Sequence, residues 1–327
     1  MIMKKINLIY IIIFSVGVLY SCNNDTVLPE ETMHKVTFKV SANSDADTKV
    51  SYNMNRAGDK LIWDEGDKIA VYGKTNYYIS NQPFSISPQS SPSSSATFTG
   101  YLAGSFYTPY ATDTYVATYP YNVSRIVGWV SPMMNDNFTT IFPLEQKYVA
   151  GGFTGLPAVA VLYNNNIEGA TMGFVTTCNV LRLKLQIDNI SAYDNVLLER
   201  VEIKYYNGGY TPLDLPESVI FNISNLSNWY SNHTVSYSLT YAYKEAIKYT
   251  APGVLIPKAS VNNPLILHIG IPANFSSLAN EAWIHVIVSI NGVLGQSARA
   301  FNPATVDTGI NTIYDTPILT INPAPGL

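Results

Sequence analysis

Apolar and polar residues alternate with a period of two along much of this chain, and this pattern constrains its fold most strongly. Residues 180–187, for example, alternate apolar side chains with Arg182, Lys184 and Gln186. Such alternation is typical of strands with one buried face and one wet face. The same pattern occurs in residues 35–40, 68–72, 201–205, 235–241, 265–271, 283–290 and 318–321. No segment sustains a helical period with caps and length, so we expect an all-β protein.

Turn-forming residues separate these segments, and the pairs Asn207-Gly208 and Asn291-Gly292 are the strongest hairpin signals. At 327 residues the chain is long for one compact domain, so two domains are expected. The polar turn at residues 188–192 follows the most regular strand. We therefore divide the chain into an N-terminal β-sandwich of residues 35–187 and a C-terminal β-sandwich of residues 188–327.

The N-terminus has the features of an export signal. Two lysines precede an apolar run over residues 6–20, which is too short to span a bilayer comfortably and ends at Ser21 and Cys22. We interpret residues 1–21 as a signal peptide and residues 22–34 as a flexible tether. The residues around Cys22 resemble a bacterial lipobox, in which the cysteine is acylated. Cys178 then has no disulfide partner in the chain and is expected to pack as a small apolar residue.

Several classes of function find no support in the sequence. A net charge of −4, spread over the chain, provides no basic patch for nucleic acid. The four histidines lie far apart without a zinc-binding spacing, and we expect His268 and His285 to face solvent. No Gly-x-Ser-x-Gly elbow or phosphate-binding loop occurs. We expect no enzyme, cofactor or metal, although a hydrolase site assembled from distant residues remains an alternative.

The most specific local motif is Trp-x-x-Gly-Asp-x-Ile at residues 63–69, which follows a Thr-Lys step at Thr48 and Lys49. Trp63 is expected to fill the core, Gly66 to form a turn and Asp67 to cap that turn. Calcium binding by the acidic residues of this motif is the alternative, but they lack the spacing of an EF-hand loop. Residues 119–121, 156–160 and 174–181 provide further landmarks.

This layout resembles the N-terminal domain of the fimbrillin-type (type V) pilus subunits of Bacteroidetes. The resemblance implies two transthyretin-like β-sandwiches and export as an outer-membrane lipoprotein to the cell surface. It also implies assembly by strand exchange: a trypsin-like protease removes the first strand, and a strand from another pilin subunit fills the groove. Lys49 and Arg56 are the candidate residues for cleavage on their C-terminal side.

The sequence therefore favours a fimbrial structural subunit or a tip or accessory adhesin, with other pilin subunits as partners and the outer membrane contacted through the lipid. The alternative is a glycan-binding surface lipoprotein that stacks sugars of host or bacterial surfaces on Trp129 and Trp229, which lie in loop-like surroundings. Host or bacterial surface proteins are further candidate ligands, both for a fimbrial adhesin and for a glycan-binding lipoprotein.

Overall fold

The structure is a computed structural model of the 327-residue chain. It describes residues 33–41, 60–74, 82–88, 93–103, 114–121, 137–150, 152–153, 155–162, 166–189, 191–207, 211–222, 235–241, 245–261, 263–272, 281–301 and 313–325.

These residues form strands, with one short 3-10 helix, η1 (Ala259–Val261), so the expected all-β class is confirmed. The strands that precede β13 in the chain are β1 (Met33–Ser41), β2 (Lys60–Leu61), β3 (Lys68–Lys74), β4 (Gln82–Ile86), β5 (Ser95–Ala103), β6 (Thr114–Tyr119), β7 (Asn137–Ile141), β8 (Glu145–Lys147), β9 (Gly152–Phe153), β10 (Ala158–Leu162), β11 (Thr171–Gly173) and β12 (Val175–Thr176). Those that follow are β13 (Asn179–Ile187), β14 (Val196–Asn207), β15 (Thr211–Pro212), β16 (Pro216–Asn222), β17 (Val235–Tyr241), β18 (Ile247–Leu255), β19 (Leu265–Ile271), β20 (Glu281–Ile290), β21 (Val293–Phe301), β22 (Ile313–Ile321) and β23 (Ala324–Pro325).

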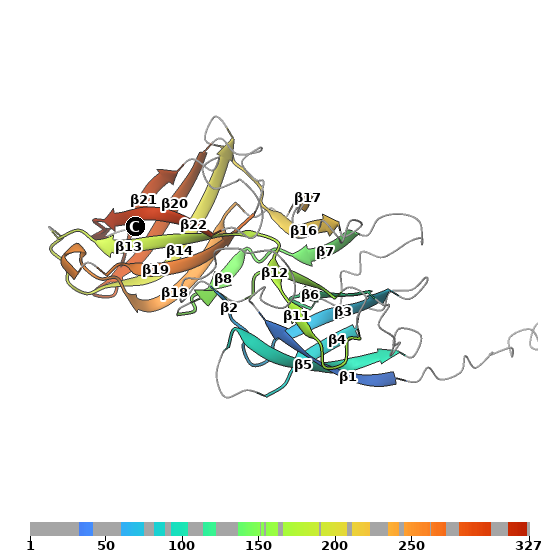
Figure 1. Cartoon of the computed structure of the whole chain (residues 1–327). Coiled ribbons are helices and arrows are strands. Elements are labelled where there is room, and N and C mark those ends of the chain that lie inside the picture. Colours follow the sequence, from blue (N-terminus) through green and yellow to red (C-terminus); the bar gives the residue numbers. More distant parts are fainter. Residues whose placement is uncertain are drawn as a thin grey trace, which may run out of the picture.

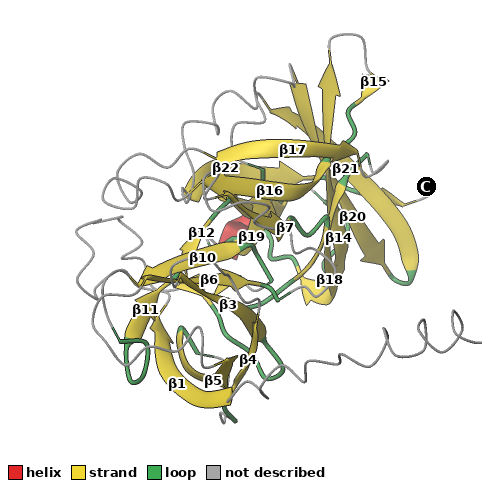
Figure 2. Cartoon of the chain, turned by 90° about the vertical axis from the view of Figure 1, so that its right-hand side faces the viewer, coloured by secondary structure: helices red, strands yellow, loops and turns green. Residues whose placement is uncertain are grey.

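The N-terminal half is built around one eight-stranded sheet with the order β11-β1-β5-β4-β3-β6-β10-β12. Its two outermost strands, β11 and β12, follow each other in the chain and are separated only by Phe174. The two ends of the sheet must therefore lie close together, and Figure 2 shows the sheet curled accordingly. The inner face of the curl carries large apolar side chains, as the alternation in the sequence predicts.

The C-terminal half contains a three-stranded sheet, β19-β13-β22, and a larger sheet with the order β23-β21-β20-β14-β18-β8 and β15 beside β14. Figure 1 shows these strands grouped at one end of the molecule. Leu181, Leu183 and Leu185 of β13 are buried in the same core as alternate residues of β14 and β20. A register shift between Leu198 and Arg200 marks a β-bulge in β14. Because the bulge inserts one residue, Leu198 and Val201 are both buried despite their odd spacing.

The hairpin predicted at Asn291-Gly292 is confirmed. It joins β20 to β21, which pair antiparallel along their whole length. Both turn residues have positive φ, 50° for Asn291 and 81° for Gly292. Two consecutive positive φ angles are the requirement of a type I′ turn, which Asn-Gly satisfies with little strain.

Two expected boundaries differ from the structure. The tether was expected to extend to residue 34, but β1 already begins at Met33. The boundary between the two halves was expected after residue 187. However, β13 pairs with β19 and β22 of the C-terminal half, so it belongs to the C-terminal sheets. Strands β7 and β8 also precede the expected boundary, yet they pair with β16 and β18.

Residues that precede β13 in the chain cover one end of the β19-β13-β22 sheet. The side-chain amide of Gln146, on β8, bonds both backbone groups of Gly270: Nε2 donates to the carbonyl oxygen at 2.9 Å, and the Gly270 N–H donates to Oε1 at 2.8 Å. Leu156 packs against Gly270, and the Phe153 ring lies 6.3 Å from the His268 ring. His268 is only 4% exposed, so the expectation that it faces solvent is wrong. It lies on the face of β19 opposite the one that carries the core residues Leu267 and Ile269, but Phe153 of the N-terminal half packs against it here.

Candidate functional site

The first strand occupies an unusual position for an N-terminal element, because it lies within its sheet. On one side β1 pairs antiparallel with β5 over nine residues, from Met33 opposite Ala103 to Ser41 opposite Ser95. On the other side its last three residues pair parallel with β11. Figure 2 shows β1 along the curled sheet with β5 beside it.

The inner face of β1 supplies three side chains to the core. Val36, Phe38 and Val40 are each at most 1% exposed, as the alternation in residues 35–40 predicts. The Phe38 ring lies 5.4 Å from the Phe84 ring of β4, measured between centroids. The Phe84 ring in turn lies over Gly100, where a Cβ would stand only 2.6 Å from it. Because Gly100 has no side chain, the Phe84 ring can lie over it and pack against Phe38 in the middle of β1.

The opposite face of β1 is polar and carries Lys35, Thr37 and Lys39. The hydroxyl of Thr37 lies 3.1 Å from that of Thr99 on β5, within hydrogen-bond distance. This face contributes cross-strand polar contacts, whereas the inner face fills an apolar slot.

The Trp63 motif forms the centre of this core, and the expected burial of Trp63 is confirmed at 0% exposure. Its indole makes edge-to-face contacts with the rings of Phe98, Tyr119 and Phe174, at centroid distances of 5.3, 5.0 and 5.1 Å. These three residues lie in β5, at the end of β6 and between β11 and β12. The single indole therefore joins separate parts of the curled sheet.

The turn that follows Trp63 has the predicted form. Gly66 has φ +89°, a conformation that favours glycine. The Asp67 N–H donates to the Asp64 carbonyl oxygen at 3.2 Å, and the Asp67 carboxylate accepts the Asp64 N–H at 2.7 Å. The cap and the turn of the motif are thus both confirmed.

Asp67 also connects this turn to two other segments. The Tyr119 hydroxyl donates to the Asp67 carboxylate at 2.8 Å and accepts the Gly155 N–H at 3.1 Å. Burial raises the pKa of Asp67 above its ordinary value, and the hydrogen bonds from Asp64 and Tyr119 partly oppose that rise. The carboxylate therefore acts as a structural acceptor within this cluster.

Most of the site residues predicted from the sequence lie outside the described residues. These are Cys22, Lys49, Arg56, Trp129 and Trp229. Their assigned roles therefore stay predictions from the sequence. Cys178, in contrast, is described: it is a free, buried cysteine, as expected, and burial raises the pKa of its thiol.

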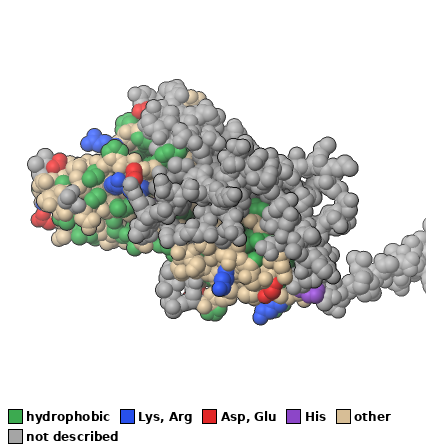
Figure 3. All heavy atoms as spheres, in the orientation of Figure 1, with side chains coloured by type: hydrophobic (Ala, Val, Ile, Leu, Met, Phe, Trp, Pro, Cys, Tyr) green, Lys and Arg blue, Asp and Glu red, His purple; other side chains and the backbone are tan. Residues whose placement is uncertain are grey.

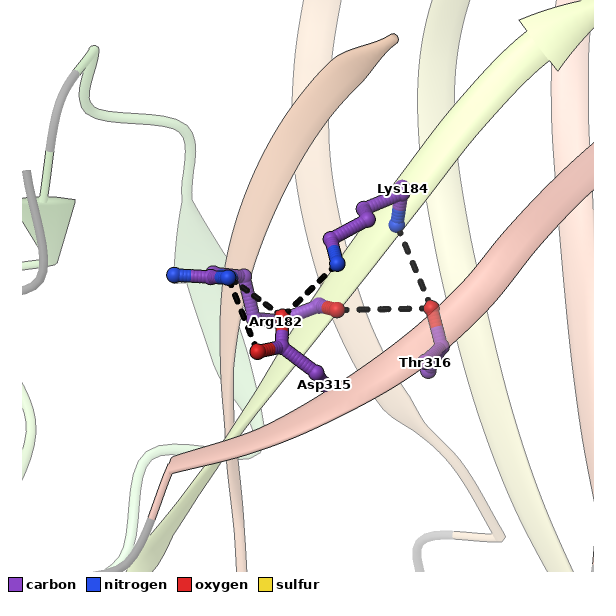
Figure 4. Close-up of polar contacts among 4 residues, drawn as sticks. All are labelled: Arg182, Lys184, Asp315 and Thr316. Atoms are coloured by element: carbon purple, nitrogen blue, oxygen red, sulfur yellow. Dashed lines mark hydrogen bonds and ion pairs between the residues drawn. The ribbon is translucent and has the colours of Figure 1, made fainter.

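A second polar cluster lies between β13 and β22 (Figure 4). The Arg182 guanidinium donates to both carboxylate oxygens of Asp315, at 2.5 and 2.8 Å, and Lys184 Nζ lies 3.0 Å from one of them. The strand register shifts here, between Arg182 and Lys184. The Thr316 hydroxyl donates to the Arg182 carbonyl oxygen and accepts the Lys184 N–H, each at 3.3 Å. The Thr316 hydroxyl thus takes the place of backbone hydrogen bonds between β13 and β22 beside Pro317, because Pro317 has no N–H to donate.

A third charged cluster lies on β14, where Arg200 Nε donates to the Glu202 carboxylate at 2.8 Å and Lys204 Nζ lies 3.8 Å from the same carboxylate. On the face drawn in Figure 3, the described Lys and Arg side chains form small separate patches, and acidic side chains lie beside some of them. Within the described ranges, no three His, Cys, Asp or Glu side chains are grouped so that they could hold a metal ion. Among these same residues, no helix has the length and hydropathy that a bilayer crossing requires.

Comparison with known proteins gives structural neighbours only. No protein-family model matches the sequence, and no curated protein matches it. A proposed cell adhesion protein from Bacteroides uniformis is similar, with a TM-score of 0.46 and 12% identity over 88% of this chain and 93% of that one. A second, from Bacteroides ovatus, has a TM-score of 0.43 and 13% identity over 90% and 96%. A fimbrial assembly protein from Parabacteroides distasonis has a TM-score of 0.27 and 12% identity over 81% and 99%.

Sequence reasoning did not single out the residues that hold the outer edge of β1. These belong to the segment 166–174, which contains Glu168 and β11. The Glu168-Gly169 pair signals a turn. Its position beside β1, however, follows only from the fold, because 131 residues separate Glu168 from Thr37.

Proposed function

We propose that this chain is a structural subunit or a tip or accessory adhesin of a surface fimbrium. It is exported as an outer-membrane lipoprotein acylated on Cys22, and it assembles with other pilin subunits by strand exchange. One observation carries the proposal: β1 is the first described strand in the chain, yet it lies inside its sheet between β5 and β11. Because β1 is the first of the described strands, it can be cut away while the described strands that follow stay covalently joined.

The energetics support a groove that needs an occupant. Each of the buried side chains Val36, Phe38 and Val40 contributes about 1.5–3 kcal/mol by burial. The ladder between β1 and β5 adds hydrogen bonds of about 0.5–1.5 kcal/mol each. Loss of β1 would expose an apolar slot and the backbone edge of β5. Such an edge pairs readily with an incoming strand.

The cut that frees β1 is assigned to the segment 42–59, which contains Lys49 and Arg56 and lies outside the described residues. In this scheme the protein has no enzymatic role, and its partners are other pilins and the ligands of the finished fimbrium.

The test is cleavage by a trypsin-like protease followed by assembly. We expect one new N-terminus, at residue 50 or 57, and heat-dissociable ladders on a gel when a partner pilin is added. The variant carrying both Lys49→Gln and Arg56→Gln should resist the cut and stay monomeric. Lys147→Gln, at an exposed lysine of β8, is the matched control and should behave like the wild type.

Two outcomes would contradict the proposal: cleavage only at other sites, or a trimmed protein that stays monomeric with every candidate pilin. Binding of the intact monomer to a glycan array, lost on substitution of Trp129 or Trp229, would then support the glycan-binding alternative.

A further inference from the structure

The outer edge of β1 is held by residues 166–174, which we call the clasp. The Glu168 carboxylate accepts the backbone N–H of Thr37 at 3.0 Å. The backbone N–H of Gly169 donates to the Thr37 carbonyl oxygen at 2.8 Å. Both backbone groups of Thr37 are therefore bonded to the clasp, and one of these bonds uses a charged side chain.

The clasp continues these contacts to the end of β1. The Lys39 N–H donates to the Ala170 carbonyl oxygen at 2.8 Å, and the Phe174 N–H donates to the Ser41 carbonyl oxygen at 3.0 Å. Between these bonds, β11 pairs with residues 39–41. Backbone groups of the odd-numbered residues at the C-terminal end of β1 thus face the clasp, and the even-numbered residues supply the buried side chains.

The clasp also has contacts outside β1. Ile167, Met172 and Phe174 are buried, and the Phe174 ring contacts the indole of Trp63. Gly169, with φ +73°, forms its turn, in which the Ala170 N–H donates to the Ile167 carbonyl oxygen at 3.1 Å. Its last residue leads directly into β12 at the far end of the sheet order. The clasp therefore closes the ring of strands over β1.

We infer that the clasp retains β1 after the chain is cut, so that opening of the clasp sets the rate of strand exchange. This inference rests on the proposed function, because it assigns regulation to the same groove. A strand bonded along both edges leaves only after one edge opens. The clasp side is the weaker one, since β11 pairs with three residues of β1 and β5 pairs with nine. Glu168 is exposed, so its bond to Thr37 is the accessible point at which opening begins.

The first test uses the intact, uncut chain and is independent of protease and assembly. Hydrogen exchange of the Thr37 amide is measured by NMR in the wild type and in three variants. Glu168→Ala removes the acceptor, and we expect exchange about 3- to 10-fold faster, the effect of one lost hydrogen bond. Glu168→Gln keeps an acceptor oxygen and should stay within about twofold of the wild type. Glu245→Ala, at an exposed glutamate on the C-terminal half, should have no effect.

The second test measures the exchange of the strand itself. After cleavage in the segment 42–59, a fluorescent synthetic peptide of residues 33–41 is added, and its uptake in place of the cut strand is followed. Glu168→Ala should accelerate uptake by the same factor as it accelerates amide exchange, whereas Glu245→Ala should not. Equal rates for Glu168→Ala and the wild type in both tests would overturn the clasp. If the peptide is taken up but no pilin ladder forms, the clasp stands and the fimbrial proposal fails.

Discussion

At the scale of single residues, the N-terminal core depends on Trp63. Its indole touches aromatic rings from three separate parts of the curled sheet, and one of them, Phe174, ends the clasp over β1. No smaller side chain can keep all three contacts. The tryptophan of the motif is therefore explained by packing alone.

We predict that Trp63→Ala lowers the free energy of unfolding by about 3–5 kcal/mol, the usual cost of deleting a large buried aromatic side chain. That is a large part of the roughly 5–15 kcal/mol of a typical domain. Urea denaturation followed by circular dichroism measures the change. Trp63→Phe retains an aromatic ring and should lose clearly less, and an unchanged midpoint for Trp63→Ala would contradict the central packing role.

Gly270 is the second residue whose identity the packing requires. A Cβ at this position would lie 2.3 Å from Leu156 Cδ2 and 3.3 Å from Gln146 Nε2. Leu156 and Gln146 are both buried, so neither can move away freely. The close approach of the two halves thus depends on the missing side chain.

We predict that Gly270→Ala destabilises the protein by about 1–3 kcal/mol through overpacking. Leu156→Ala alone should cost about 2–5 kcal/mol. The double variant should cost less than the sum of the two, because removal of the Leu156 side chain makes room for the new methyl group. Denaturation midpoints of all four proteins give the coupling, and strictly additive losses would mean that the two positions do not touch.

At the scale of elements, the last long strand, β22, is fixed to β13 by charge as well as by its ladder. Arg182 is nearly buried, with 9% of its side chain exposed, and Asp315 is 38% exposed. Burial alone would raise the pKa of Asp315. The hydrogen bonds from Lys184 and Arg182, together with their charges, outweigh this effect and lower the pKa below its ordinary value.

A lowered pKa in the folded state gives a stability contribution that is present above the unfolded pKa of about 3.9 and is lost as the pH falls through the folded value. We therefore predict that Asp315→Asn costs of order 1 kcal/mol at pH 7, a value discounted for solvent screening of this exposed carboxylate. The difference from the wild type should shrink below about pH 4.

The measurement is urea denaturation of the wild type and the variant at pH 7 and pH 3. Asp194→Asn is the matched control, because Asp194 pairs with Lys258 at 2.6 Å but is 82% exposed. The loss in free energy of unfolding for Asp194→Asn should be smaller than that for Asp315→Asn at both pH values. A cost for Asp315→Asn that stays the same at pH 3 would show that the hydrogen-bond geometry, and not the charge, fixes β22.

At the scale of the whole molecule, the two halves are interlocked. Strands β7 and β8 leave the N-terminal half and pair with β16 and β18, while β13 carries the chain from the end of the curled sheet into the centre of a C-terminal sheet. The segment that covers β1 therefore runs through β12 into β13. The proposed exchange groove and the joint between the halves are parts of one continuous stretch of chain.

The sequence by itself determined the features that depend on local chemistry. Alternation at residues 35–40 and 180–187 specified strands and the faces of the apolar side chains, because the pleat has a period of two. The Asn-Gly pair at residues 291–292 specified a hairpin, since two positive φ angles strongly favour these residues. Gly66 and Asp67 specified a capped turn, because glycine readily adopts a positive φ and an aspartate side chain bonds a nearby backbone N–H.

Only the tertiary structure decided which strands become neighbours. His268 alternates with the core residues Leu267 and Ile269 and is nevertheless buried, because Phe153 from the other half of the chain packs against it. The strand at residues 179–187 pairs with strands more than 75 residues later in the chain, so no local turn could reveal its sheet. Glu168 reaches Thr37 across 131 residues. Contacts of this kind depend on packing among distant segments, and the period of a single strand carries no information about them.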